Sequence, residues 1–151
     1  RMLPGTSSPV PIIKQAIKSA EKIKADYLIM DAPPGTSCPF IQTVAQADFV
    51  ILVTEPTPFG LSDLRQAVDS LRTLNLLFGV VINRAGVGDQ AVYHYLQTEN
   101  IPLLAEIPFD KEIARLYSKG TIVSEKMPEV KSVFENIVNQ LKYYGNSGNK
   151  R

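Results

Sequence analysis

Residues Asp26 to Cys38 read D-Y-L-I-M-D-A-P-P-G-T-S-C, and this stretch decides the fold that we expect. Tyr27 to Met30 form an uninterrupted apolar run, which is typical of a strand buried on both faces of a parallel sheet. Asp31 follows directly, so we expect its carboxylate at the sheet edge where open α/β folds bind ligands. After two prolines, Gly35 leaves a backbone N–H free to approach a phosphate oxygen closely. The alternative is an ordinary strand end, where the aspartate caps a turn.

Three further apolar segments follow, and helical patterns separate them. The other expected strands are 49–54, 78–82 and 102–107. The expected helices are about 10–24, 40–46, 62–74 capped by Ser62, 90–99, 110–118 capped by Asp110, and 128–144. This alternation predicts an α/β fold, with a mainly parallel sheet of about four strands and helices on both faces. We expect residues 1–144 to form one domain portion and residues 145–151 to be a disordered tail.

The composition is that of a soluble globular protein, with 44% apolar and 21% charged residues. A net charge of +1 gives no reason to expect nucleic acid or an anionic membrane as a partner. Cys38 is the only cysteine, so no intrachain disulfide or CxxC motif can form, and a reduced, cytoplasmic setting is expected. We find no apolar run of about 18 residues and no signal peptide, so membrane insertion is not expected. The sequence does not begin with Met, and we expect it to be part of a longer protein.

Polar groups follow each expected strand, and the carboxyl ends of parallel strands share one sheet edge. Asn83 offers an amide that can pair with the edge of a base, although asparagine is also common in turns. Arg84 can stack on a base or lie in solvent. Pro108 and Asp110 can bracket an aromatic ring, or Asp110 can simply cap a helix. The weaker candidates, for which a structural or surface role is the simpler reading, are Glu55, His94 and Cys38.

Four motifs, in order and in register, resemble the MinD/ParA/Mrp family of deviant Walker-A P-loop ATPases. Residues 26–37 resemble the Walker B and switch II stretch, V-V-I-N-R at 80–84 the base-recognition strand, and I-P-F-D at 107–110 the adenine-side loop. The stretch A-D-F-V-I-L-V-T-E-P-T-P-F-G-L-S-D-L at 47–64 is similar to MinD-superfamily ATPases that carry an inserted ferredoxin domain. The likeness covers nearly the whole chain and implies a partial P-loop NTPase fold.

The resemblance implies a role for each candidate residue in binding and hydrolysing ATP. Asp31 would hold the water shell of Mg²⁺ and help to place the attacking water, and the Gly35 N–H would sense the γ-phosphate. Asn83 would read the adenine edge. The residues expected beside it in the base pocket are Arg84, Pro108 and Asp110. The reaction would be phosphoryl transfer to water.

The family's phosphate-binding loop, a glycine-rich stretch with Lys before Ser or Thr, has no counterpart in the sequence. The only adjacent Gly and Lys are Lys119-Gly120. We therefore expect the chain to be the C-terminal half of such an ATPase, with an iron–sulfur cluster in a domain outside this sequence. By itself it should bind ATP or ADP weakly, if at all, and not hydrolyse ATP, so the chain alone is expected to be inactive. The strand expected beside the switch II strand is also missing, and a homodimer or a strand shift would cover the exposed edge.

Three functions remain open. The first is a nucleotide-dependent switch with an iron–sulfur or electron-transfer partner. The second is a MinD-like membrane-positioning ATPase, which is disfavoured because the last helix lacks the basic amphipathic pattern of a membrane anchor. The third is a non-catalytic α/β interaction domain. A Gly-Lys-Thr loop and clustered cysteines in the full-length protein would favour the first, and the loop alone would leave the second open.

Overall fold

The computed structural model describes residues 9–148, with side chains up to Tyr144. The chain forms two compact units, residues 1–47 and 48–151. In the first unit, helix α1 (Val10–Ala20) packs against helix α2 (Cys38–Val44). Proline stands in the first turn of both helices, where its missing N–H is not needed. Helix α1 ends four residues before the expected boundary at Lys24.

The apolar run from Tyr27 to Met30 is irregular in the structure, and the predicted strand there is wrong. Ile29 is 90% exposed, and Tyr27 and Leu28 are about half exposed. A strand exists only through hydrogen bonds to a neighbouring strand, and within residues 9–148 no strand pairs with this run. Asp31 therefore lies in an exposed irregular segment rather than at the end of a buried strand.

The second unit is built on a parallel sheet, as predicted, with three strands where about four were expected. Strands β1 (Val50–Thr54), β2 (Phe78–Ala85) and β3 (Leu103–Pro108) lie in the order β1-β2-β3. Both pairings are parallel, with Thr54 opposite Ile82 and Asn83 opposite Ile107. The three carboxyl ends therefore lie along one edge of the sheet.

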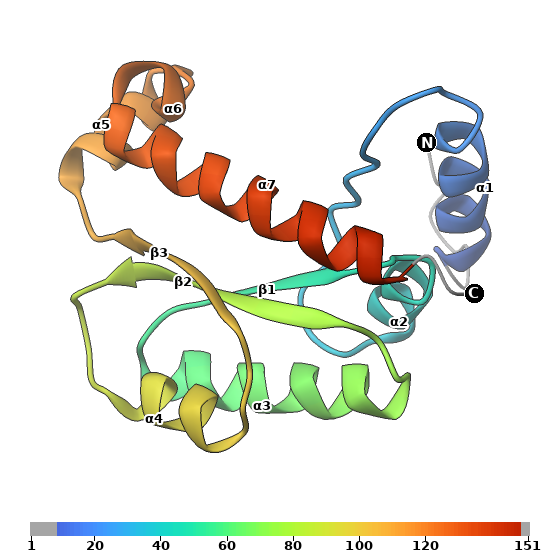
Figure 1. Ribbon diagram of the computed structural model, residues 1–151, viewed down its shortest axis with the longest axis horizontal. Coiled ribbons are helices and arrows are strands. Elements are labelled where there is room, and N and C mark those ends of the chain that lie inside the picture. Colours follow the sequence, from blue (N-terminus) through green and yellow to red (C-terminus); the bar gives the residue numbers. More distant parts are fainter. Residues whose placement is uncertain (1–8, 149–151) are drawn as a thin grey trace. The chain divides into compact units, whose positions relative to one another are not determined.

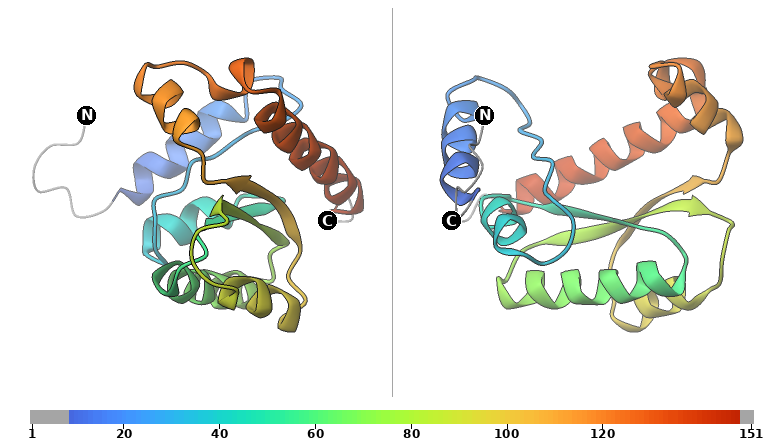
Figure 2. Two further views of the ribbon diagram at one scale, coloured as in Figure 1. Left: turned by 90° about the vertical axis from the view of Figure 1, so that its left-hand side faces the viewer. Right: turned by 180° about the vertical axis from the view of Figure 1, so that it is seen from behind.

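Helices cover both faces of this sheet (Figures 1 and 2). Helices α3 (Pro58–Thr73) and α4 (Ala91–Thr98) lie on one face, and α7 (Pro128–Gly148) crosses the other. Helix α5 (Lys111–Ser118) and the short α6 (Val123–Lys126) lead into α7. Helix α6 lies between two of the helices expected from the sequence and was not itself expected. Helix α7 continues past the expected end at Tyr144, and residues 149–151 of the predicted tail lie outside the described residues.

Helix α3 begins earlier than expected because Thr57, not Ser62, is its N-cap. The Thr57 hydroxyl accepts a hydrogen bond from the Gly60 N–H at 3.0 Å, and Pro58 occupies the first helical position. The predicted cap at Asp110 and the expected helix end at Ser118 are both confirmed, and Gly120, with a φ of +68°, follows shortly after.

The core of this unit lies on both sides of β2, because successive side chains of a strand point to opposite faces. On the α7 side, Val81 forms a buried cluster with Leu104 and Ile137. The buried residues of α3 and α4 are Leu64, Val68, Leu71, Val92 and Leu96. A smaller buried cluster of Leu116, Met127 and Val130 ties α5 to α7. Within the described chain, no helix combines the length and the hydropathy that crossing a bilayer requires.

Candidate functional site

The loops that follow the three strands are joined to one another at the carboxyl edge of the sheet. The Phe109 N–H donates to the Ala85 carbonyl at 3.0 Å, so the end of β3 is fastened to the end of β2. The Asp89 N–H donates to the Pro56 carbonyl at 3.2 Å, which fastens the loop after β2 to the loop after β1. Four of the six predicted site residues therefore come together on this edge. They are Asn83, Arg84, Pro108 and Asp110.

Gly88 makes the second of these contacts possible. Its φ is +95°, and a Cβ atom there would lie 1.8 Å from the Pro56 carbonyl oxygen. Only glycine combines this backbone conformation with so close an approach. The loop after β2 thus contains a glycine that holds the edge together.

Arg84 connects the ends of all three strands. It lies in a β-bulge between Asn83 and Ala85 and has a φ of +56°, which is unusual for a residue with a side chain. Its guanidinium is 3.3 Å from the Glu55 carboxylate and 5.0 Å from the centre of the Phe109 ring. The side chain remains 49% exposed. The sequence left open whether Arg84 simply lies in solvent. The structure shows a half-exposed side chain that contacts both Glu55 and Phe109.

Asn83 is half-buried beside this arginine. Within the part of the chain that the structure describes, nothing hydrogen-bonds to its side-chain amide, which leaves both a donor and an acceptor available. Such an amide fits the edge of a nucleobase. The exposed Pro108 ends β3 on the same edge.

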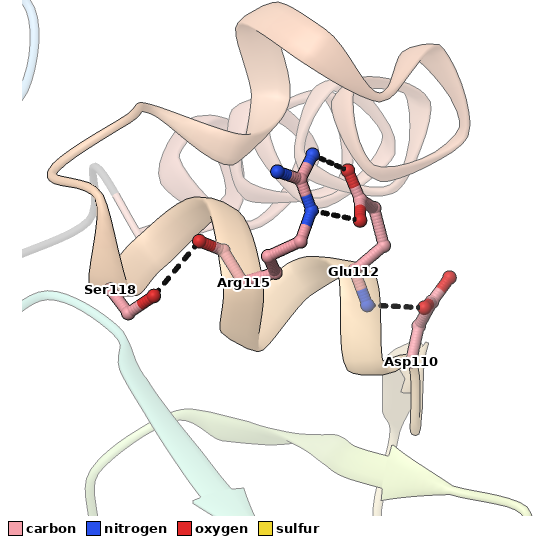
Figure 3. Close-up of polar contacts among 4 residues, drawn as sticks. All are labelled: Asp110, Glu112, Arg115 and Ser118. Atoms are coloured by element: carbon pink, nitrogen blue, oxygen red, sulfur yellow. Dashed lines mark hydrogen bonds and ion pairs between the residues drawn. The ribbon is translucent and has the colours of Figure 1, made fainter.

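Asp110 caps helix α5, which is the structural alternative considered from the sequence (Figure 3). Its Oδ1 accepts the Glu112 N–H at 2.7 Å. Arg115 then donates two hydrogen bonds to the Glu112 carboxylate, and these bonds lower the pKa of Glu112. The Ser118 hydroxyl donates to the Arg115 carbonyl at 2.9 Å. The cap fixes the residue at which α5 begins. It thereby limits the conformations of residues 108–110, which connect β3 to α5.

Asp31 and Gly35 belong to the first unit. Asp31 is exposed, and Gly35 has a φ of +80° with open space where a Cβ would stand. Mg²⁺ in nucleotide sites takes one or two carboxylates, with water and phosphate oxygens as its other ligands, so an accessible aspartate is a suitable donor. The described residues contain no group of three or more His, Cys, Asp or Glu that could hold a metal without such help. That Asp31, Gly35 and Asn83 open onto one cleft stays a prediction.

Glu55 and Phe109 are the residues of this edge that sequence reasoning undervalued or missed. Glu55 was a weak candidate, because a glutamate at a strand end is commonly just exposed. Phe109 was present in the I-P-F-D motif, but nothing local indicated that it faces Arg84. Two open hollows in the second unit, of about 440 and 280 Å³, lie along α7 and at the amino end of the sheet, and neither includes a predicted site residue.

Comparison with known proteins gives a family match over most of the chain. The model described as "ParA: NUBPL iron-transfer P-loop NTPase" matches residues 7–142. The uncharacterized protein MJ0579 of Methanocaldococcus jannaschii is 30% identical over 136 residues, which are 89% of this chain and 46% of that protein. The iron–sulfur cluster carrier protein of Aquifex aeolicus is 27% identical over 93% of this chain and 45% of the relative. The cytosolic Fe-S cluster assembly factor CFD1 of Kluyveromyces lactis is 30% identical over 79% and 48%.

Solved structures of the same architecture exist. The cell division ATPase MinD of Pyrococcus furiosus has a TM-score of 0.72 and 25% identity, over 89% of this chain and 58% of that chain. MinD of Aquifex aeolicus has a TM-score of 0.71 at 17% identity, over 88% and 61%, and supports the fold alone. The chain spans about half the length of the curated relatives it matches.

Proposed function

Because this chain belongs to the NUBPL iron-transfer family of ParA-type P-loop NTPases, we propose that it forms the base-binding side of an ATP-dependent switch in iron–sulfur cluster handling. The observation that carries the proposal is the sheet edge that unites Asn83, Arg84 and Phe109. Relatives named as an iron–sulfur cluster carrier and an Fe-S assembly factor support the second half of it.

The chemistry of this edge fits an adenine base. A base needs a flat surface to stack on and hydrogen-bonding groups along its edge. The guanidinium of Arg84 and the ring of Phe109 are flat, and the Asn83 amide offers one donor and one acceptor. Pro108 and Asp110 complete the proposed pocket from the β3 side.

For the phosphates, we propose the roles that the family resemblance implies. Asp31 would hold the water shell of Mg²⁺, and the Gly35 N–H would contact the γ-phosphate. Bound Mg²⁺ would neutralise the charge that develops on the transferred phosphoryl group. The open space around Gly35 supports a close approach of its backbone to a ligand.

We propose that residues 1–144 correspond to the C-terminal portion of the family's ATPase domain, as the order of the motifs suggests. No Gly-Lys-Ser or Gly-Lys-Thr loop occurs in the 151 residues, so the main ring of amides and the lysine for a triphosphate are not part of this sequence. The chain alone should therefore bind ATP weakly and leave it unhydrolysed. An iron–sulfur cluster would be its cargo, with further ligands supplied from outside this sequence, since Cys38 alone cannot hold one.

A MinD-like role in membrane positioning is the second candidate. The apolar stripe of α7 weighs against it, because Ile137 lies in the core with Leu141 and Tyr144 packed against that cluster. These packed residues are not available to insert into a bilayer, whereas Phe134 and Val138 of the same helix are exposed. A non-catalytic interaction domain is the third candidate, and nucleotide binding separates it from the first.

Titration of the 151-residue chain with ATP and GTP, followed by calorimetry and by NMR, tests the proposal. We expect millimolar affinity, a preference for ATP, no phosphate release, and loss of the preference in Asn83→Ala. Asn139→Ala, an exposed asparagine on α7, is the matched control. Micromolar affinity would contradict the expected weakness. The absence of any base preference, with Asn83→Ala silent, would favour an interaction domain instead.

A further inference from the structure

Glu55, Arg84 and Phe109 form one connected group across the carboxyl edge of the sheet. They come from the loop after β1, the end of β2 and the loop after β3. The Arg84 Nη1 atom lies 3.3 Å from Glu55 Oε2, and its guanidinium carbon lies 5.0 Å from the Phe109 ring centroid. All three side chains remain partly exposed, with Phe109 47% exposed. The group is thus both ordered and accessible.

The backbone at Arg84 is what makes this arrangement possible. Three described residues other than glycine have positive φ, and two of them, Asn75 and Asn100, come immediately after the C-caps of helices α3 and α4. Asparagine at a helix end tolerates that conformation well. Arg84 has no such explanation, because it lies in a strand, at a bulge. A bulge re-aims a side chain, and here it directs a long planar cation toward Glu55 and Phe109.

We propose that Glu55 and Phe109 hold the Arg84 guanidinium as a stacking platform for the base of a nucleotide, with Glu55 as its positioning residue. This inference deepens the proposed function and rests on it. A guanidinium has two flat faces; its central carbon lies over the Phe109 ring, and the ion pair to Glu55 restrains the direction of its edge. A planar ligand would stack on a guanidinium face not turned toward Phe109, and Asn83 precedes Arg84 in the chain.

The ion pair also sets what Arg84 can recognise. A free arginine on a ligand-binding edge is a good phosphate ligand, because its forked donors match phosphate oxygens. Glu55 occupies one of the Arg84 N–H donors and partly neutralises its positive charge. The flat face of the guanidinium then contributes more to ligand binding than its charge does. The pair therefore favours an uncharged aromatic base over a phosphate at this position.

The experiment uses ¹H–¹⁵N NMR of the whole chain, in which the Arg84 Nε–H signal reports its surroundings. Without ligand, we expect this signal to be shifted by the Phe109 ring and to return toward the ordinary position in Glu55→Gln and Phe109→Leu. Adenosine, titrated as a base without phosphates, should shift the Arg84 signal in the natural sequence. We expect its dissociation constant to rise about two- to fivefold in Glu55→Gln, as for an exposed ion pair. The control Glu99→Gln breaks the similarly exposed ion pair to Arg72 near the amino end of the sheet and should change neither readout.

Arg84→Lys separates stacking from charge, because lysine keeps the charge and lacks the flat face. We expect it to weaken adenosine binding, and to strengthen the binding of inorganic triphosphate relative to adenosine. Adenosine binding that is unchanged in both Glu55→Gln and Arg84→Lys overturns the inference and leaves the proposed function standing. If adenosine and ATP both fail to shift any signal of the 83–84 or 108–110 residues at millimolar concentration, the proposed function fails, and the inference fails with it.

Discussion

Gly86 and Gly88 lie in the same loop after β2 and have nearly the same φ, +89° and +95°, but their surroundings differ. A Cβ at Gly86 would meet open space, whereas a Cβ at Gly88 would meet the Pro56 carbonyl at 1.8 Å. Gly86→Ala should lower the free energy of unfolding by about 1–2 kcal/mol through backbone strain alone. Gly88→Ala should lower it by a further ~1–3 kcal/mol, because the clash must be relieved by moving the loop.

Urea unfolding of both variants measures this difference. Because the two substitutions share the same chemistry and nearly the same φ, the difference isolates the contact with Pro56. Equal losses in the two variants would mean that the loop after β2 does not rest on the loop after β1.

Asp110 is both the cap of α5 and a proposed member of the base pocket, and two substitutions separate these roles. Asp110→Ala removes the acceptor for the Glu112 N–H and should lower the free energy of unfolding by about 1 kcal/mol. Asp110→Asn keeps a good cap and should leave stability nearly unchanged. Urea unfolding measures both, with Asp63→Ala as a control, because Asp63 lies inside α3 and is not a cap. A large loss in Asp110→Asn would show that the charge, rather than the cap, is what the fold requires.

Residues whose role is set by their near neighbours could be predicted from the sequence, and those set by distant partners could not. The Asp110 cap and the end of α5 at Ser118 depend on residues within a few positions, and both are confirmed. Thr57 was missed as a cap because Ser62 offered an equally acceptable local signal. The Glu55–Arg84 pair joins residues 29 positions apart, and no local pattern indicates it.

At the scale of elements, the contact between α7 and the sheet carries much of the second unit's core. Ile137 is buried against Val81 and Leu104, and the Gln140 amide donates to the Leu104 carbonyl at 2.7 Å. Ile137→Ala should therefore lower the free energy of unfolding by about 2–5 kcal/mol. Val138→Ala, next to it on the same helix but 40% exposed, should change stability far less.

Chemical denaturation followed by circular dichroism compares these two variants. A similar small loss in both would mean that α7 is not docked on β3 in solution. Loss of the ordered Gln140 amide signal in Ile137→Ala would show directly that the helix has separated from the strand.

Three of the four strands were predicted within a few residues, because each has both an apolar pattern and a neighbour to pair with. The fourth, Tyr27 to Met30, has the pattern without the neighbour. An apolar run indicates which side chains tend to be buried. Strand formation also requires backbone hydrogen bonds to another segment, which the run itself does not reveal. The strand at Tyr27 to Met30 was predicted although the segment expected to pair with it is not part of this sequence. The same missing partner led to the expectation of an unpaired sheet edge.

At the scale of the whole molecule, the second unit contains the part of the site that depends on parallel strand ends. Parallel pairing alone brings the ends of β1, β2 and β3 to one edge, so Asn83, Arg84, Pro108 and Asp110 could be grouped from the sequence. Asp31 and Gly35 belong to the other unit, and the parallel strand ends of the sheet do not group them with Asn83. A common site for all six residues remains a prediction.

The outer edge of β1 leads to the last prediction. Within the described residues, β1 pairs only with β2, so one row of its backbone donors and acceptors has no strand partner. Along this strand Ile51 and Val53 are exposed, Val53 by 64%. An apolar strand with an open edge readily accepts another strand, and natural proteins commonly prevent this with lysine. We therefore expect the chain to self-associate through β1, and Val53→Lys to weaken the association.

Sedimentation velocity over a range of protein concentrations measures the effect. The matched control is Ile122→Lys, which places the same charge at a residue 60% exposed between α5 and α6. The natural sequence and the control should associate as concentration rises, while Val53→Lys should remain monomeric to higher concentration with unchanged circular dichroism. A natural chain that stays monomeric at high concentration would contradict self-association itself. If both lysine substitutions weakened the association equally, the added charge alone would account for the change. The association would then not be assigned to β1.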